Sequence, residues 1–371
     1  MKKLVSLLVV TLVCSLLTAQ INPPKRKVQL VILFDTSNSM DGLIDQAKSR
    51  IWTIVNEASG LKYNGEIPTI EIAMYDYGND GLSAASNYIR QQTPFTTNLD
   101  VVSEKLFSLK TNGGSEYCGA VIQKSLNELA WSNDPKDLKL IYIAGNEPFN
   151  QGPINYKEVC SQATAKGVFV NTIYCGDGLQ GIREFWKDGA TCSKGEYFNI
   201  NSNQKVVYIE TPYDEQINQQ NIKLNGTYVG YGAISTYNLS NQVAQDNNAA
   251  VQSKAVVAER ALVKSKKSAY KNVEWDAVDA IEADSTFLEK VKEEDLPKEL
   301  KGKSKEEQQK YIKEKGEERD KIQAEIGRLG VEREKYIQEE MKKRNESGKT
   351  DDFGSAVAKS LKEKAKSLGY E

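Results

Sequence analysis

The sequence contains no histidine. This absence excludes catalytic dyads and triads built on histidine, zinc sites with histidine ligands, and pH switches based on imidazole. The chain also has no large net charge, because it contains 49 basic and 51 acidic residues. The chain therefore has no electrostatic signature of a protein that binds nucleic acid or an anionic membrane. An enzyme of this composition would need a carboxylate pair or a metal-activated water, and no cofactor signature is present, so we expect a non-enzymatic protein.

Long apolar runs are missing after the N-terminus. The run Leu4–Leu17 follows Lys2 and Lys3 and is too short for a dedicated membrane span. A charged start, an apolar stretch and a small residue such as Ala19 are typical of a secretory signal. We therefore predict a signal peptide over residues 1–20. The mature protein is expected to be exported, with no membrane-spanning segment, and to be periplasmic, on the cell surface or secreted.

The remainder begins with a strand and a helix that are easily recognised. The residues Val28–Phe34 are almost all apolar, as in a strand that is buried on both faces of a parallel sheet. An amphipathic helix follows over about 43–58. Strands and helices continue to alternate along the chain. Further strands are expected at 69–75, near 87–91, at 138–144, at 167–175 and near 196–199. The pattern predicts an α/β fold, with a doubly wound, mostly parallel six-stranded sheet flanked by helices.

Three oxygen-bearing side chains follow the first strand at alternate positions: Asp35, Ser37 and Ser39. Open α/β sheets bind ligands at the carboxyl ends of their strands, where this loop should lie. A carboxylate and two hydroxyls suit a hard divalent cation. A purely structural interpretation is also open, in which the two serines cap the helix that starts near Met40 and Asp35 accepts hydrogen bonds from loop amides.

The sequence Asp35-Thr36-Ser37-Asn38-Ser39 resembles the metal-ion-dependent adhesion site of von Willebrand factor A domains. A second loop of that family, Gly-Gly-Thr or Gly-Gly-Ser before a helix, is matched here by Gly113-Gly114-Ser115. The resemblance covers roughly residues 27–226 and implies a Rossmann-like fold. It also implies that Asp35, Ser37, Ser39 and Ser115 bind a divalent cation, Mg²⁺ first, with Mn²⁺ or Ca²⁺ as alternatives.

The third loop departs from the family pattern, since Gly145 stands where an aspartate is expected. Fewer carboxylates weaken the retention of a cation, but they leave a bound cation more attractive to an acidic partner. Asn146 or Glu147 could substitute through a water, and Glu116 is close to Ser115 in sequence. The resemblance implies a protein-binding module that engages an acidic side chain of a protein partner through the metal.

The segment 227–371 is dense in charges of both signs and rich in helix-forming residues. An apolar stripe that includes Ile322, Ile326 and Leu329 follows helical spacing and is interrupted by Arg333. Two interpretations remain open, a helical extension packed on itself or on the domain, and a coiled-coil homo-oligomer. The alternative function follows from this segment: a metal-independent envelope scaffold that acts through its C-terminal helices.

Loss of the signal peptide would leave four cysteines: Cys118, Cys160, Cys175 and Cys192. An even number in an exported chain suggests disulfides, and four cysteines allow three pairings. The predicted fold favours Cys118 with Cys175, because both should lie on the rim of the metal loops. It would then pair Cys160 with Cys192, and buried free thiols are the alternative.

Overall fold

The computed structural model describes residues 25–206, 208–343 and 353–371, so the predicted signal peptide lies outside the described residues. Within this part of the chain a six-stranded sheet has the order β3-β2-β1-β4-β5-β6. The strands are β1 (Lys27–Asp35), β2 (Thr69–Tyr77), β3 (Ile89–Thr96), β4 (Leu138–Gly145), β5 (Phe169–Cys175) and β6 (Tyr197–Ile200). Neighbouring strands are parallel except for the antiparallel pair β2 and β3. The predicted doubly wound, mostly parallel sheet is confirmed.

Alternate side chains of the central strand enter two different cores. Leu30, Ile32 and Phe34 pack with α1 (Asp41–Ala58) and α2 (Leu99–Ser108) on one face. Val31 and Leu33 pack on the other face with α3 (Cys118–Glu128) and α4 (Tyr156–Ala165). A strand covered on both faces favours apolar residues at successive positions, which explains the nearly continuous apolar run.

The chain after β5 forms two short helices, α5 (Gly178–Arg183) and α6 (Trp186–Thr191). The break falls at Phe185, which has a left-handed backbone with φ 67°. This turn directs the next side chain inward. Trp186 is fully buried, and its indole Nε1 donates a hydrogen bond to the Glu147 carbonyl at 2.8 Å.

One of the two predicted disulfides is present. Cys160 and Cys192 are bonded and join α4 to the end of α6, as expected. The predicted bond between Cys118 and Cys175 is wrong, because both are buried free thiols. Their side chains enter opposite cores, with Cys118 on the α3 face of the sheet and Cys175 on the α1 face. The same rim therefore holds both residues, but the sheet separates their sulfur atoms.

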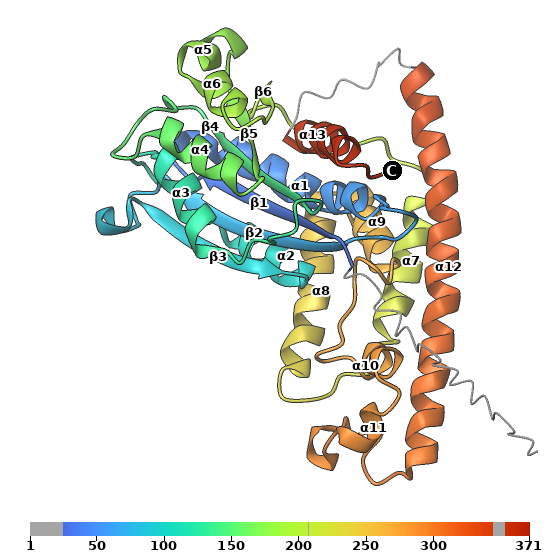
Figure 1. Ribbon diagram of the computed structural model, residues 1–371. Helices are drawn as coiled ribbons and strands as arrows, with labels where there is room; N and C mark the ends of the chain where they lie inside the picture. Colours follow the sequence, from blue (N-terminus) through green and yellow to red (C-terminus); the bar gives the residue numbers. More distant parts are fainter. Residues whose placement is uncertain (1–24, 207, 344–352) are drawn as a thin grey trace, which may run out of the picture.

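The helices after the sheet are α7 (Asp214–Asn225), α8 (Ser235–Gln252), α9 (Lys254–Lys264), α10 (Ala277–Ala283), α11 (Phe287–Lys290), α12 (Lys305–Lys343) and α13 (Phe353–Ser367). Short 3₁₀ turns occur at Asn38–Met40, Ala84–Ser86 and Glu293–Asp295. Figure 1 shows α12 as a long helix along one side of the molecule, with α7, α9 and α10 between it and the remaining structure. None of the helices in the described ranges is both long and apolar enough to cross a bilayer.

The long helix α12 is packed onto its own chain. Ile322, Ile326 and Leu329 join the core that also contains the α1 face of the sheet. Arg333, which interrupts this stripe, is buried and donates hydrogen bonds to the carboxylates of Asp214 at 2.7 Å and Glu259 at 2.6 Å. The apolar stripe that a coiled coil would use is thus covered within the chain, which favours the packed helical extension.

The C-terminal helix α13 returns to the sheet. It packs on α1, β4 and β5, and the Phe353 ring lies 5.5 Å from that of Phe34. Beyond the helix, the Tyr370 hydroxyl donates a hydrogen bond to the Lys136 carbonyl at 3.1 Å. The helical segment and the sheet therefore share one core, and the predicted division at residues 226 and 227 stays a prediction.

Candidate metal centre

Loops from three parts of the chain meet where β1 ends. The Thr36 amide donates to the Tyr77 carbonyl at 2.9 Å, and the Thr36 carbonyl accepts from the Asn112 amide at 2.9 Å. The Asp80 amide donates to the Gly113 carbonyl at 3.0 Å. These backbone hydrogen bonds hold the loop after β1, the loop after β2 and the loop before α3 against one another.

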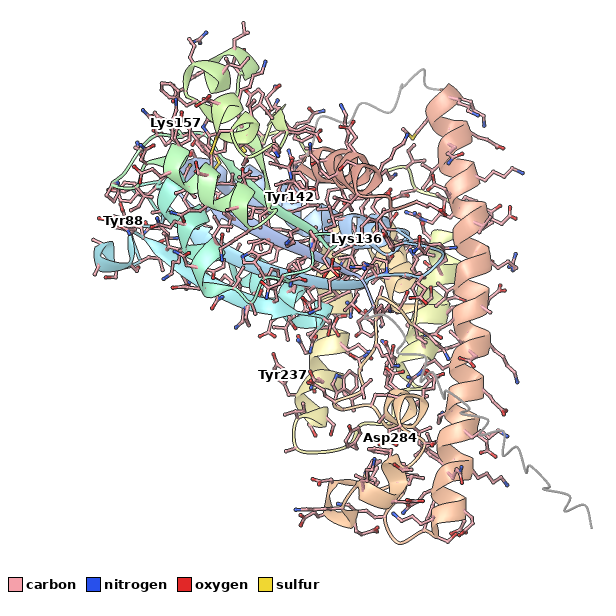
Figure 2. All side chains as sticks on the ribbon, in the orientation of Figure 1. Tyr88, Lys136, Tyr142, Lys157, Tyr237 and Asp284 are labelled. Atoms are coloured by element: carbon pink, nitrogen blue, oxygen red, sulfur yellow. A yellow bond between two sulfur atoms is a disulfide. The ribbon has the colours of Figure 1, made fainter. Side chains whose placement is uncertain are left out.

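This rim lies at the edge of the sheet that faces away from α12 (Figure 1). In Figure 2, Tyr88 marks the rim side of the sheet and Lys136 marks the opposite edge, nearer α12. The helical extension is therefore on the other side of the molecule from the candidate site, and its described helices leave this end of the sheet uncovered.

Asp35 lies fully buried at the centre of the rim. Its Oδ1 atom accepts a hydrogen bond from the Ser37 amide at 2.7 Å. Its Oδ2 atom is also buried but finds no hydrogen-bond donor among the described residues. One half of the carboxylate is thus used to shape the loop, and the other half is left to bind something that the protein chain does not supply.

Glu116 extends from the loop before α3 to Asp35, and only 5% of it is exposed. Its carboxyl group lies within hydrogen-bonding reach of both Asp35 and the Ser37 hydroxyl. Its Oε2 atom, like Asp35 Oδ2, has no donor in the described part of the chain. Burial raises the pKa of both carboxyl groups, and the charge of Asp35 raises that of Glu116 further. Two carboxylates at such proximity require a proton or a cation between them.

The hydroxyls of the first loop lie next to this pair. The oxygens of Ser37 and Ser39 are 3.1 Å apart, and the amide nitrogen of Asn146 donates to Ser39 at 3.2 Å across to the third loop. Ser37 precedes a short 3₁₀ turn but makes no side-chain capping hydrogen bond there. The capping interpretation is therefore not supported for Ser37, whereas the hydrogen bond from a loop amide to Asp35 is present.

Ser115 is half-buried and directly precedes Glu116. Within the described residues, no hydrogen bond links its hydroxyl to Asp35, Ser37 or Ser39. Hydrogen bonds thus link three of the four predicted ligands, Asp35, Ser37 and Ser39. From the second loop, Glu116 lies within hydrogen-bonding reach of Asp35 and Ser37. Sequence reasoning omitted Glu116 from the ligand set, although an acidic residue directly after the Gly-Gly-Ser loop was a visible signal.

Gly145 has no room for the aspartate found in related patterns. A Cβ atom at this position would lie 2.7 Å from the Tyr77 hydroxyl, 3.0 Å from Asp35 Oδ2 and 3.2 Å from the Trp186 ring. The Tyr77 hydroxyl is fixed there, because it donates a hydrogen bond to the Ala144 carbonyl at 3.0 Å. The volume that a third-loop side chain would take is therefore filled by two aromatic residues.

The donor set suits a hard divalent cation. Two carboxylates and two hydroxyls supply oxygen ligands, and Mg²⁺ completes its shell with water. The described residues hold no cluster of three or more cysteine, aspartate or glutamate side chains arranged for a metal. A cation at this rim would accordingly rely on two carboxylates, the serine hydroxyls and water.

Comparison with known proteins finds similarity to solved structures only. No family model and no curated protein matches the sequence. Among solved structures, BatB from Bacteroides thetaiotaomicron is similar over 47% of this chain and 90% of its own, at 17% identity and a TM-score of 0.35. The SpRpn10 VWA domain matches 49% of this chain and 99% of its own, at 14% identity and a TM-score of 0.36.

A von Willebrand factor type A protein from Catenulispora acidiphila is also similar. It covers 48% of this chain and 39% of its own length, at 14% identity and a TM-score of 0.36. Von Willebrand factor A domains, which the two loop motifs resemble, are thus among the solved structures that are similar to this chain. At these identities the likeness concerns the fold of about half of the chain and not its activity.

Proposed function

We propose that this chain is an exported, non-enzymatic protein-binding module that holds a divalent cation at the rim formed by Asp35, Ser37, Ser39 and Ser115. The observation that carries the proposal is the pair of buried carboxylate oxygens, Asp35 Oδ2 and Glu116, which have no donor in the described chain. Structural carboxylates that are buried are normally paired, so an unpaired site at a ligand-binding edge indicates a missing cation.

The expected partner group is a carboxylate. Neutral hydroxyl ligands leave part of the cation's charge uncompensated, and Mg²⁺ keeps waters that an incoming acidic oxygen can replace. Ser37 and Ser39 supply such neutral oxygens. An aspartate or glutamate of another protein therefore fits the site better than a neutral or cationic group.

An apolar patch beside the third loop supports a protein as the partner. The patch consists of Leu179, Ile182 and Phe185, with exposed fractions of 66%, 43% and 42%. It is fixed to the rim, because Trp186 bonds to the Glu147 carbonyl and the Phe149 amide donates to the Glu184 carbonyl at 2.9 Å. A bulky residue held at positive φ, such as Phe185, is strained, and strain of this kind gathers at binding surfaces.

The role of the helical extension follows from its packing. The apolar stripe of its long helix α12 packs into the chain's own core. The extension therefore supports and orients the domain that contains the sheet. The alternative, a metal-independent scaffold that acts through these helices, would need an apolar surface to assemble on. The exposed face of α12 is instead mostly charged, although Val331 is 69% exposed. We therefore prefer the binding module.

The test is a thermal unfolding experiment on the full chain with Mg²⁺ or Mn²⁺ and with a chelator. A cation that binds only the folded state must raise the melting temperature, by the equivalent of about 2.7 kcal/mol at one hundred times its dissociation constant. Asp35→Asn should abolish the shift. A wild-type protein with no shift at millimolar metal would overturn the metal-dependent proposal. Chelator-insensitive capture of a partner would favour the scaffold.

A further inference from the structure

We propose that Glu116 is a direct ligand of the cation and supplies, from the second loop, the carboxylate that the third loop lacks. This inference rests on the proposed function and adds to it a residue that the motif does not contain. It makes the site a two-carboxylate centre of Asp35 and Glu116 with serine hydroxyls. It follows from three observations: the reach of Glu116, the lack of space at Gly145, and the lack of any cationic side chain beside the pair.

Two glycines allow Glu116 to reach the rim. A Cβ atom at Gly78 would lie 2.6 Å from Glu116 Cγ and 3.1 Å from Asp35 Oδ1, so the side chain passes over a position that must stay bare. A Cβ atom at Gly114 would lie 1.8 Å from the Gly78 carbonyl oxygen. The loop before α3 can approach the loop after β2 this closely only because both positions are glycine.

The space around Asp35 explains why position 116, and not position 145, carries a carboxylate. The Tyr77 hydroxyl and the Trp186 ring occupy the volume beside Asp35 Oδ2 into which a side chain at 145 would project. The opposite side of Asp35, toward Gly78, is where Glu116 lies. A side chain at position 145 would thus meet Tyr77 and Trp186, whereas Glu116 approaches Asp35 from the side of Gly78.

No protein cation neutralises the pair. Among the described residues, no lysine or arginine forms a salt bridge with Asp35 or Glu116, and neither Asp35 Oδ2 nor Glu116 Oε2 accepts a hydrogen bond. The nearby exposed Glu147 adds a further negative charge instead. Two buried carboxylates with no basic side chain bonded to them, at a ligand-binding edge, point to a divalent cation as their partner.

Direct ligation has a consequence for the partner. Two carboxylates hold a divalent cation more firmly than one, so the cation should remain bound when the partner leaves. The partner's acidic side chain then replaces a water and is not needed to hold the metal. Metal affinity should therefore be measurable on the isolated chain.

The experiment is a titration of the full chain with Mn²⁺, followed by the loss of the electron paramagnetic resonance signal of the free ion. Four proteins are compared: wild type, Asp35→Asn, Glu116→Gln and Glu147→Gln. Glutamine keeps the shape of the glutamate and removes its charge. Glu147 is an exposed neighbour, so its variant measures the effect of losing one nearby charge without losing a ligand.

If Glu116 is a ligand, Glu116→Gln should weaken Mn²⁺ binding by about tenfold or more, whereas Glu147→Gln should change it by about twofold at most. Binding that is lost in Asp35→Asn but unchanged in Glu116→Gln would overturn this inference and leave the metal site of the proposed function standing. Equal weakening by both glutamine variants would also overturn it, because it would assign the effect to long-range charge. No binding by the wild type would overturn both.

Discussion

Buried acidic groups are treated differently in the two halves of this molecule. On the helical side, Asp246 lies between Arg260 and Lys264, which contact its carboxylate at 2.5 and 3.2 Å. Burial alone would raise the pKa of Asp246, but the two cations outweigh burial and hold it well below its usual range. At the rim, burial raises the pKa of Asp35 and Glu116, and no cation of the chain offsets it.

Arginines also contact buried carboxylates along the long helix, although burial and the charge of Asp276 still raise the pKa of Asp279 to about 6. Arg319 donates to Asp276 at 2.6 Å and to Asp279 at 3.0 Å, and Arg333 joins Asp214 and Glu259. Where acidic groups are structural, the fold supplies an arginine or lysine from a neighbouring helix. At the rim, no lysine or arginine of the described chain forms a salt bridge with Asp35 or Glu116, and this difference separates groups that hold the fold together from candidate ligands.

The largest change in stability is expected when a compensating cation is removed. Arg260 is fully buried and bonds to Asp100, Asp246 and the Gln242 carbonyl. Arg260→Ala therefore leaves Asp100 without its cationic partner and Asp246 with Lys264 alone. We expect the free energy of unfolding to fall by about 3–5 kcal/mol. Chemical denaturation measures this change.

The matched control for that variant is Lys254→Ala. Lys254 also pairs with a carboxylate, that of Glu215 at 3.0 Å, but both side chains are mostly exposed. Solvent screens such pairs, so no resolved change in stability is expected. If both variants destabilised the protein equally, burial would not be what distinguishes the helical-side charges, and the comparison would lose its basis.

These charge pairs also show where sequence reasoning stops. Continuous apolar runs predicted the strands, and the position of Asp35, Ser37 and Ser39 after the first of them predicted their place at the rim, since both are local signals. Arg333 was seen as an interruption of an apolar stripe. Its partners Asp214 and Glu259 lie 119 and 74 residues away, and no local pattern connects them.

Glu116 was missed and the bond between Cys118 and Cys175 was wrongly predicted for the same reason, because both depend on residues that are far apart in the sequence. An acidic residue just before a helix is usually exposed, and its burial here depends on a glycine in a different loop. Cys118 and Cys175 were correctly expected near one rim. The alternation of side chains along β5 places the Cys175 sulfur in the core on the α1 face. Cys118 begins α3, which covers the other face, so the sequence had to reveal on which face each helix packs.

A second test of the compensated region uses pH. Burial lowers the pKa of Lys264 to about 8, although Asp246 and Asp100 act in the opposite direction. The unfolded chain keeps this proton up to about pH 10.5. Between these values the unfolded state binds more protons, so stability gains up to about 3 kcal/mol as pH rises.

The variant Lys264→Met isolates this contribution from tyrosines that titrate at higher pH. The free energy of unfolding of wild type minus variant should increase from pH 8 to pH 10, as measured by denaturation at each pH. A difference that stays flat would mean that Lys264 has the same pKa in both states. The buried cation would then be fully compensated by its neighbours.

A smaller effect is expected from filling the bare position in the third loop. Gly145→Ala places a methyl group against the Tyr77 hydroxyl and Asp35 Oδ2, and overpacking of this kind costs about 2 kcal/mol. The control is Gly327→Ala on α12, where a Cβ atom meets nothing within 4 Å. That variant should be neutral or stabilising. An unchanged stability for Gly145→Ala would show that the third loop can accommodate a side chain after all.

The smallest effect has the opposite sign, and it tests the comparison most directly. Without metal, the fold must either bind a proton between the two buried carboxyl groups or bury a second negative charge beside Asp35, and both cost stability. Glu116→Gln removes this cost while it keeps the shape of the side chain. The free energy of unfolding of the metal-free protein should therefore rise by about 1 kcal/mol, whereas loss of a charged group on the helical side lowers it. Denaturant titrations of wild type and variant, both in chelator, measure the difference. If Glu116→Gln destabilised the metal-free protein as Arg260→Ala does, the rim carboxylates would be compensated within the chain like those of the helical half, and a cation site at the rim would lose its support.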